Sequence, residues 1–245
     1  MKIVLCSLKI KNSDIDFNLN QILSSMKSYS KKADLLLFGE AFLQGFNGLT
    51  WNFEKDKTIA VKQADSSLIS TILKAAKQYQ IAVAFGYFEL FNEHIYSSYL
   101  LVNNEGKIAY NYRRQSIGWK ESFADNHYCE GNACNIFTYM GKSFAVSLCG
   151  DLWNEDVAYK LSKLNADVLI WPLNRDIYYR KWNRTEKFEY AIKSKKCCKE
   201  ALVVNSYNAT SENYDDARGG ALYVNNGEIV SELPAGDEGY LVVEL

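Results

Sequence analysis

The order of apolar runs along the chain predicts an α/β protein. Short apolar segments typical of strands alternate with longer segments whose apolar residues recur at helical spacing. Two pairs of strand-like segments are joined by Asn- and Gly-containing turns, at residues 103–106 and 225–227, which predict hairpins. A hairpin brings antiparallel neighbours into a sheet, so we expect the sheets to be mixed and not purely parallel.

In the first half of the chain, apolar runs predict five strands and helical periodicity predicts two helices. The strands are expected at residues 2–8, 35–38, 81–88, 96–102 and 107–112. Helices are expected at residues 16–30 and 68–79; in the second, Leu68, Ile69, Ile72, Leu73 and Ala76 share one face.

The second half repeats this alternation. Strands are expected at residues 143–148, 168–173, 202–207, 219–224, 228–233 and 239–245, and helices at 156–164 and 185–198. The sequence has only two prolines, and no low-complexity stretch separates the halves. We therefore interpret residues 1–245 as a single domain.

Composition excludes several classes of partner. The net charge of −1, without a basic stripe or an RNA-binding aromatic motif, argues against nucleic acid. No stretch approaches the roughly 20 apolar residues of a membrane span. The apolar run at residues 3–6 is too short for a signal peptide, and the six cysteines are scattered. We expect a cytoplasmic protein.

Two apolar strands end in residues that could carry chemistry. Residues 35–40 end in Gly39 and Glu40, and residues 144–149 end in Cys149. Ligands of α/β proteins bind at the carboxyl ends of strands, and a thiol becomes a strong nucleophile when a base takes its proton. Taken alone, a buried cysteine is more often structural, and a glutamate at a strand end more often a solvated or capping residue.

Several segments, in order, resemble the nitrilase superfamily of carbon-nitrogen hydrolases. They are residues 38–46 around Glu40, 106–114, 148–153 around Cys149, 166–172, 202–206 and 219–227. The resemblance is collinear and covers nearly the whole chain. It implies a four-layer α-β-β-α sandwich with two mixed sheets, and association that is often dimeric.

The resemblance also implies a reaction. Glu40 would act as general base and Cys149 as nucleophile on a small linear amide or carbamoyl compound, through a thioester intermediate. A nitrile substrate is less favoured, and transfer of the acyl group to an amine stays open. No metal ion and no organic cofactor is implied.

The chain departs from the family at the lysine of the triad, where Arg114 stands. Arginine carries a delocalised charge and keeps its proton, yet it can donate hydrogen bonds to an oxyanion. Lys120 is a second candidate for this role. Glu121 lies near the place of a supporting glutamate in the family, although both could instead be solvated loop residues.

Further residues are candidates for the walls of the pocket. They are Phe42, Trp119, Trp153 and Asn174, with Arg175 beside the last. Asp151 matches an aspartate of the family and is interpreted as structural. A pair of Cys149 with His127 is disfavoured because nothing local orients such an imidazole.

Two other classes of function compete with the enzyme. A non-catalytic member could bind a ligand or partner through the same pocket, and the replacement at Arg114 is the feature in its favour. A purely structural protein with an inert cysteine is disfavoured by the collinear resemblance. Activation of Cys149 distinguishes these alternatives.

Overall fold

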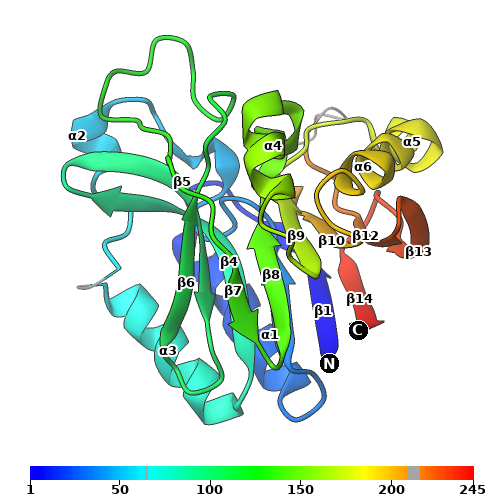
Figure 1. The fold of residues 1–245 in the computed structure, drawn as a ribbon. Helices are drawn as coiled ribbons and strands as arrows, with labels where there is room; N and C mark the ends of the chain where they lie inside the picture. Colours follow the sequence, from blue (N-terminus) through cyan, green and yellow to red (C-terminus); the bar gives the residue numbers. More distant parts are fainter. Residues whose placement is uncertain (64–65, 209–215) are drawn as a thin grey trace.

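A computed structural model describes residues 1–63, 66–208 and 216–245. Two six-stranded sheets dominate it (Figure 1). The first has the order β14 (Gly239–Glu244), β1 (Lys2–Ser7), β3 (Leu35–Phe38), β4 (Ala82–Phe91), β5 (His94–Val102) and β6 (Ile108–Arg113). The second has the order β13 (Glu228–Leu233), β12 (Ala221–Asn225), β10 (Glu200–Asn205), β9 (Val168–Leu173), β8 (Lys142–Val146) and β7 (Phe137–Tyr139).

Each sheet has a parallel centre and antiparallel edges. Strands β1, β3 and β4 run parallel in the first sheet, as β8, β9 and β10 do in the second. A hairpin extends one edge of each sheet, β5–β6 in the first and β12–β13 in the second, as the turns at residues 103–106 and 225–227 predicted. A small parallel pair, β2 (Lys9–Ile10) with β11 (Tyr207–Asn208), links the two halves of the chain.

Helices cover the outer face of each sheet. The helices α1 (Ile15–Tyr29) and α3 (Ser67–Tyr79) pack on the first sheet, and α4 (Glu155–Ser162) and α6 (Lys187–Ser194) pack on the second. Two short helices are α2 (Phe53–Asp56) and α5 (Tyr179–Lys181). Short 3-10 turns lie at η1 (Phe46–Gly48) and η2 (Cys149–Trp153), and a π-helical turn at η3 (Trp182–Glu186). The α1 helix begins at a capping residue, since Asp14 accepts a hydrogen bond from the N–H of Phe17 at 3.0 Å.

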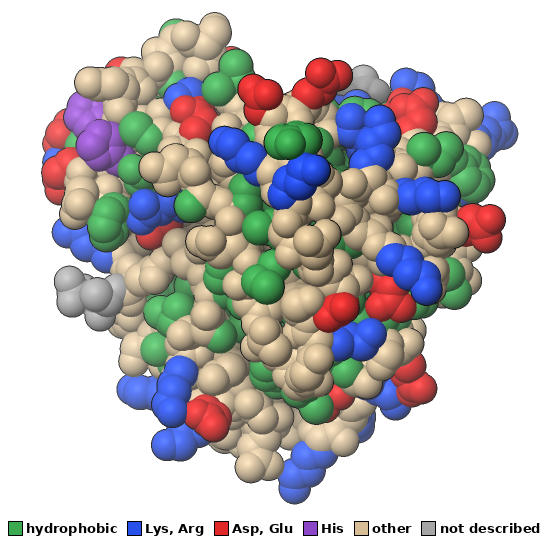
Figure 2. Space-filling view, in the orientation of Figure 1, with side chains coloured by type: hydrophobic (Ala, Val, Ile, Leu, Met, Phe, Trp, Pro, Cys, Tyr) green, Lys and Arg blue, Asp and Glu red, His purple; other side chains and the backbone are tan. Residues whose placement is uncertain are grey.

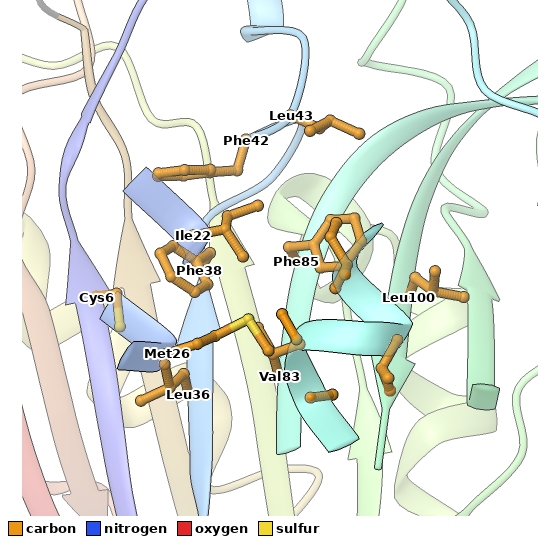
Figure 3. Packing of buried hydrophobic residues seen from close by; sticks show 14 of the residues in the cluster. Cys6, Ile22, Met26, Leu36, Phe38, Phe42, Leu43, Val83, Phe85 and Leu100 are labelled. Atoms are coloured by element: carbon orange, nitrogen blue, oxygen red, sulfur yellow. The ribbon is translucent and has the colours of Figure 1, made fainter. Parts of the chain in front are cut away.

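Alternation along the strands produces three layers of core. In β1, Val4 and Cys6 face α1 and α3, whereas Ile3 and Leu5 face the other sheet. Figure 3 shows Met26 of α1 packed against Leu36 and Val83 of the first sheet. A third cluster packs α4 and α6 on the second sheet. The predicted four-layer α-β-β-α sandwich is therefore confirmed.

Some element boundaries differ from those expected. The strand predicted at 81–88 continues to Phe91, because Glu89, Leu90 and Phe91 still pair with β5. The helix predicted at 185–198 ends at Ser194 and is preceded by the π-helical turn.

Within the described residues, no helix is long and apolar enough to cross a membrane.

Figure 2 shows basic and acidic side chains interspersed over one face, as expected for a chain of net charge −1.

Candidate active site

The ends of three strands bring Glu40, Arg114 and Cys149 to one place between the sheets. Glu40 follows β3, Arg114 follows β6, and Cys149 follows β8 of the opposite sheet. The backbone N–H of Glu40 donates to the carbonyl of Leu173 at the end of β9, at 3.1 Å. Glycine is required beside it: a Cβ on Gly39 would lie 2.9 Å from that carbonyl oxygen. The sheets therefore meet closely where the candidate residues lie.

Glu40 and Arg114 form a buried ion pair. The Glu40 side chain is 0% exposed and that of Arg114 is 3% exposed. Glu40 Oε1 accepts from Arg114 Nη1 at 2.9 Å and from Ser97 Oγ at 3.1 Å. Among the described residues Glu40 Oε2 has no hydrogen-bond partner. Pairing offsets the cost of burying both charges, while the second oxygen stays free to accept a proton.

Cys149 occupies a strained turn. Its φ is +36°, in the left-handed region that residues other than glycine rarely adopt. Ala41, directly after Glu40, has a φ of +47°. The carbonyl oxygen of Cys149 accepts a hydrogen bond from Trp171 Nε1 at 2.9 Å, which helps to hold the turn. Strained backbone of this kind clusters at functional sites, and here it occurs beside both candidate residues.

Burial and charge set the state of the thiol. The pKa of Cys149 is raised to about 12, first by burial and then by the carboxylate of Glu40. Arg114, the backbone N–H of Asn174 and Arg175 act in the opposite direction. The thiol is therefore protonated at neutral pH and needs a base to become a nucleophile.

Arg114 keeps its charge in this setting. Burial alone would lower the pKa of its guanidinium, but the negative groups around it, Glu40 first, raise that pKa overall. The site therefore holds a fixed cation beside a carboxylate and a neutral thiol.

Two cavities open beside Cys149. One, of about 210 Å³, is lined by Arg114, Gly118, Cys149 and Asn174, together with Phe46, Asn47, Arg175, Asp176 and Asp216. The other, of about 350 Å³, is lined by Cys149, Gly150, Trp153, Arg175, Glu186, Glu189 and Tyr190. Cys149 and Arg175 line both. Space for a small ligand thus adjoins the thiol on two sides.

The predicted wall residues divide into two groups. Trp153 and Asn174 line the cavities. Phe42 instead packs against Phe38 under α1, with ring centroids 4.7 Å apart (Figure 3). Trp119 is buried in an aromatic cluster with Trp51, Phe88 and Tyr128.

The remaining candidates have other partners. Lys120 Nζ donates to the carbonyl of Tyr128 at 2.6 Å and forms an ion pair with Glu130 at 2.8 Å. Glu121 is exposed. His127 stacks on Phe53 and contacts Asp125. None of the three is among the described residues that line the two cavities, whereas Arg114 is.

Sequence reasoning missed Ser97 and Tyr190. Ser97 is buried in β5 and donates to Glu40. The signal was available: Ser97-Ser98 is a polar pair inside an otherwise apolar strand. Tyr190 is buried and lines the larger cavity, and nothing in the spacing of α6 separates it from an ordinary core aromatic.

Comparisons with known sequences agree with this geometry. A family model described as carbon-nitrogen hydrolase matches residues 2–245. An (R)-stereoselective amidase of Pseudomonas sp. is 28% identical over 170 residues, covering 69% of this chain and 59% of the amidase. A glutamine-dependent NAD(+) synthetase of Aquifex aeolicus is 24% identical, covering 100% of this chain and 42% of the synthetase. The chain thus spans less than two thirds of the length of these curated relatives.

Solved structures share the fold. An amidase from Nesterenkonia sp. superposes with a TM-score of 0.79 at 17% identity, covering 100% of this chain and 90% of that one. A glutamine-dependent NAD+ synthetase from Acinetobacter baumannii gives a TM-score of 0.75 at 20% identity, covering 98% of this chain and 44% of that one. Because the family model spans nearly every residue, this chain belongs to the carbon-nitrogen hydrolase family.

Proposed function

We propose that the protein is an amidase-type hydrolase of carbon-nitrogen bonds other than peptide bonds, with Cys149 as nucleophile and Glu40 as general base. The observation that carries the proposal is the convergence of three groups. A neutral thiol lines two small cavities, and beside it a buried carboxylate with a free oxygen pairs with a fixed cation, which lines one of those cavities. This set supplies a nucleophile, a base and an electrostatic stabiliser.

The first half of the reaction forms a thioester. Glu40 takes the proton of the Cys149 thiol as the sulfur attacks the amide carbon, and the carbonyl oxygen gains negative charge. Arg114 and the backbone N–H of Asn174, which hydrogen-bonds the sulfur, line the smaller cavity with Cys149 and are the donors we assign to that charge. Glu40 then returns its proton to the amide nitrogen, the carbon-nitrogen bond breaks, and ammonia or an amine leaves.

The second half releases the acid. Glu40 takes a proton from a water molecule, whose oxygen attacks the thioester carbon. The carbon-sulfur bond breaks, a carboxylic acid forms, and the proton returns to the sulfur. The water therefore supplies the oxygen of the acid, and Cys149 and Glu40 return to their initial states.

The chemistry of Arg114 suits the electrostatic role. Its Nε and Nη1 are engaged with Ser116 and Glu40. A planar guanidinium can serve several acceptors at once, whereas an ammonium is a single point charge. The alternative of a non-catalytic binding protein, which the loss of the family lysine suggested, is therefore less favoured.

Small linear amides are the proposed substrates. Cavities of about 210 and 350 Å³ suit ligands of a few heavy atoms. Structures of variants of the Nesterenkonia amidase hold butyramide or acrylamide. For that amidase, a variant with glutamine in place of glutamate is described as showing Michael addition of acrylamide at the active-site cysteine.

The test is release of ammonia from a panel of short amides and carbamoyl compounds, with butyramide as the first substrate. We expect turnover by the wild type and none by Cys149→Ala or Glu40→Gln, with all three equally folded by circular dichroism. Replacing the free buried thiol of Cys6 by alanine is the matched control and should leave turnover intact, because Cys6 lies in the α1 core. Turnover that survives in Cys149→Ala would refute the mechanism.

A further inference from the structure

Asp151 is a buried carboxylate that the reaction itself does not use. It lies two residues after Cys149 and is 0% exposed. Each of its oxygens accepts two hydrogen bonds. Oδ1 accepts from the N–H groups of Gln115 at 3.1 Å and Ser116 at 2.8 Å, and Oδ2 from the N–H of Leu148 at 2.9 Å and the hydroxyl of Tyr112 at 2.7 Å.

These donors belong to the two segments that carry the reacting groups. Gln115 and Ser116 directly follow Arg114, and Leu148 directly precedes Cys149. The first segment leaves β6 of one sheet and the second leaves β8 of the other. The carboxylate of Asp151 therefore accepts hydrogen bonds from two loops that leave different sheets.

The chain of contacts continues to the base. Ser116, whose N–H bonds Asp151, accepts at Oγ from Arg114 Nε at 2.9 Å. Arg114 Nη1 then reaches Glu40 Oε1 at 2.9 Å. Gly150 leaves room for this guanidinium, since a Cβ there would lie 2.5 Å from Arg114 Nη2. Three successive contacts thus run from Asp151 to Glu40.

We propose that Asp151 is a positioning residue, which holds the guanidinium of Arg114 against Glu40 and Cys149. The proposal rests on the proposed function, because it concerns the same nucleophile and base. An asparagine at this position has one oxygen and an NH₂ group, so it cannot accept from all four donors. Asp151→Asn should therefore release Ser116 and let Arg114 move away from the thiol.

Asp56 offers a matched control. It is 1% exposed and also accepts four hydrogen bonds: from the N–H and Oγ1 of Thr50, the N–H of Trp51 and the hydroxyl of Tyr128, at 2.7–2.9 Å. Its donors lie in residues 50–51 and at Tyr128, away from the Arg114 and Cys149 segments. Asp56→Asn removes an equivalent structural contact without touching the candidate site.

The experiment measures iodoacetamide alkylation of Cys149 against pH, by peptide mass spectrometry, with butyramide turnover in parallel. In Asp151→Asn we expect alkylation at a given pH to slow about tenfold, because Arg114 no longer stabilises the thiolate. Loss of the Asp151 charge by itself would favour the thiolate, so slower alkylation reports displacement of Arg114. We expect kcat to fall about a hundredfold with little change in KM.

Asp56→Asn should lower the melting temperature and leave both readouts unchanged. If Asp151→Asn also leaves both the alkylation rate of Cys149 and butyramide turnover unchanged, Asp151 is merely structural and the proposal is overturned. If Asp151→Asn fails to fold, Ser116→Ala breaks the next contact and must slow alkylation in the same way; an unchanged rate there also overturns it. A wild type that hydrolyses no amide refutes the proposed function, while slower alkylation in Asp151→Asn would still support the positioning role.

Discussion

Replacement of Arg114 separates its electrostatic role from its structural one. Arg114→Met removes the cation and leaves Glu40, which is 0% exposed, with Ser97 as its hydrogen-bond partner. Removing one partner of a buried ion pair costs about 3–5 kcal/mol of folding stability, unless the carboxylate takes up a proton. A protonated Glu40 could not act as the base at neutral pH, and an ionised Glu40 would still lack the cation that stabilises the oxyanion, so kcat should fall in either case.

Arg114→Lys tests whether any cation at this position is sufficient for catalysis. Arginine donates to Ser116 through Nε and to Glu40 through Nη1, both at 2.9 Å. A lysine has one nitrogen on a flexible stem, so at most one of these contacts keeps its geometry. Loss of one charge-assisted hydrogen bond costs about 1.5–3 kcal/mol, and loss of one donor to a developing oxyanion costs about 10²–10³ in kcat. We expect Arg114→Lys to fold and to retain at most about 1% of kcat.

The neighbouring Arg113 provides the matched control. It pairs with the buried Glu89 through two contacts of 2.8 Å, and successive residues of a strand point to opposite faces. Arg113→Lys should therefore lower stability without a selective loss of kcat. The assay is urea unfolding for stability, with kcat and KM for butyramide. Wild-type kcat in Arg114→Met, or an equal loss in Arg113→Lys, would refute the reasoning.

Three further predictions follow from single contacts. Gly150→Ala should fold but lose at least about tenfold in butyramide turnover, because its Cβ would displace Arg114 Nη2. Normal turnover in this variant would contradict the close contact between Gly150 and Arg114. Ser97→Ala should lower the free energy of unfolding by about 1–3 kcal/mol, since Glu40 loses a buried hydrogen bond; urea unfolding with no change would contradict it. The folded state raises the pKa of Cys149 to about 12, so above about pH 9 the unfolded thiol ionises first and stability falls. Cys149→Ala should lose less stability than wild type between pH 8 and 10, and equal losses in thermal melts would count against the raised pKa.

Apolar periodicity and turn residues were sufficient to predict most of the fold. The hairpins at residues 103–106 and 225–227, and the buried strands around Leu36 and Ile170, were predicted because their apolar pattern is a local property. The π-helical turn at Trp182–Glu186, whose Trp182 packs in the cluster on the second sheet, was not predicted, since apolar periodicity does not distinguish it from an α-helix.

The candidate site was predicted in part. Positions at strand ends identified Glu40 and Cys149, and the resemblance directed attention to Arg114. Phe42 was predicted as a pocket wall, but it packs against Phe38 in the cluster under α1. Lys120 was a reasonable substitute by charge alone, yet its partner Glu130 lies ten residues ahead and could not be predicted from spacing.

The strained backbone at Cys149 could not be predicted either. No glycine marks its φ of +36°, and the Trp171 contact that supports the turn comes from β9. Contacts between segments far apart in the sequence depend on tertiary structure, which single-sequence patterns do not contain.

The central claim is that Cys149 and Glu40 act as a pair, and alkylation of all six cysteines against pH tests it most directly. Peptide mass spectrometry would give the iodoacetamide rate of each thiol in wild type and in Glu40→Gln. Because the charge of Glu40 raises the pKa of Cys149, its loss should speed alkylation of Cys149 at pH 8–9 while butyramide turnover disappears. The other five thiols should not change. A Cys149 rate that is the same in both proteins, or turnover that survives in Glu40→Gln, would contradict the nucleophile–base pair.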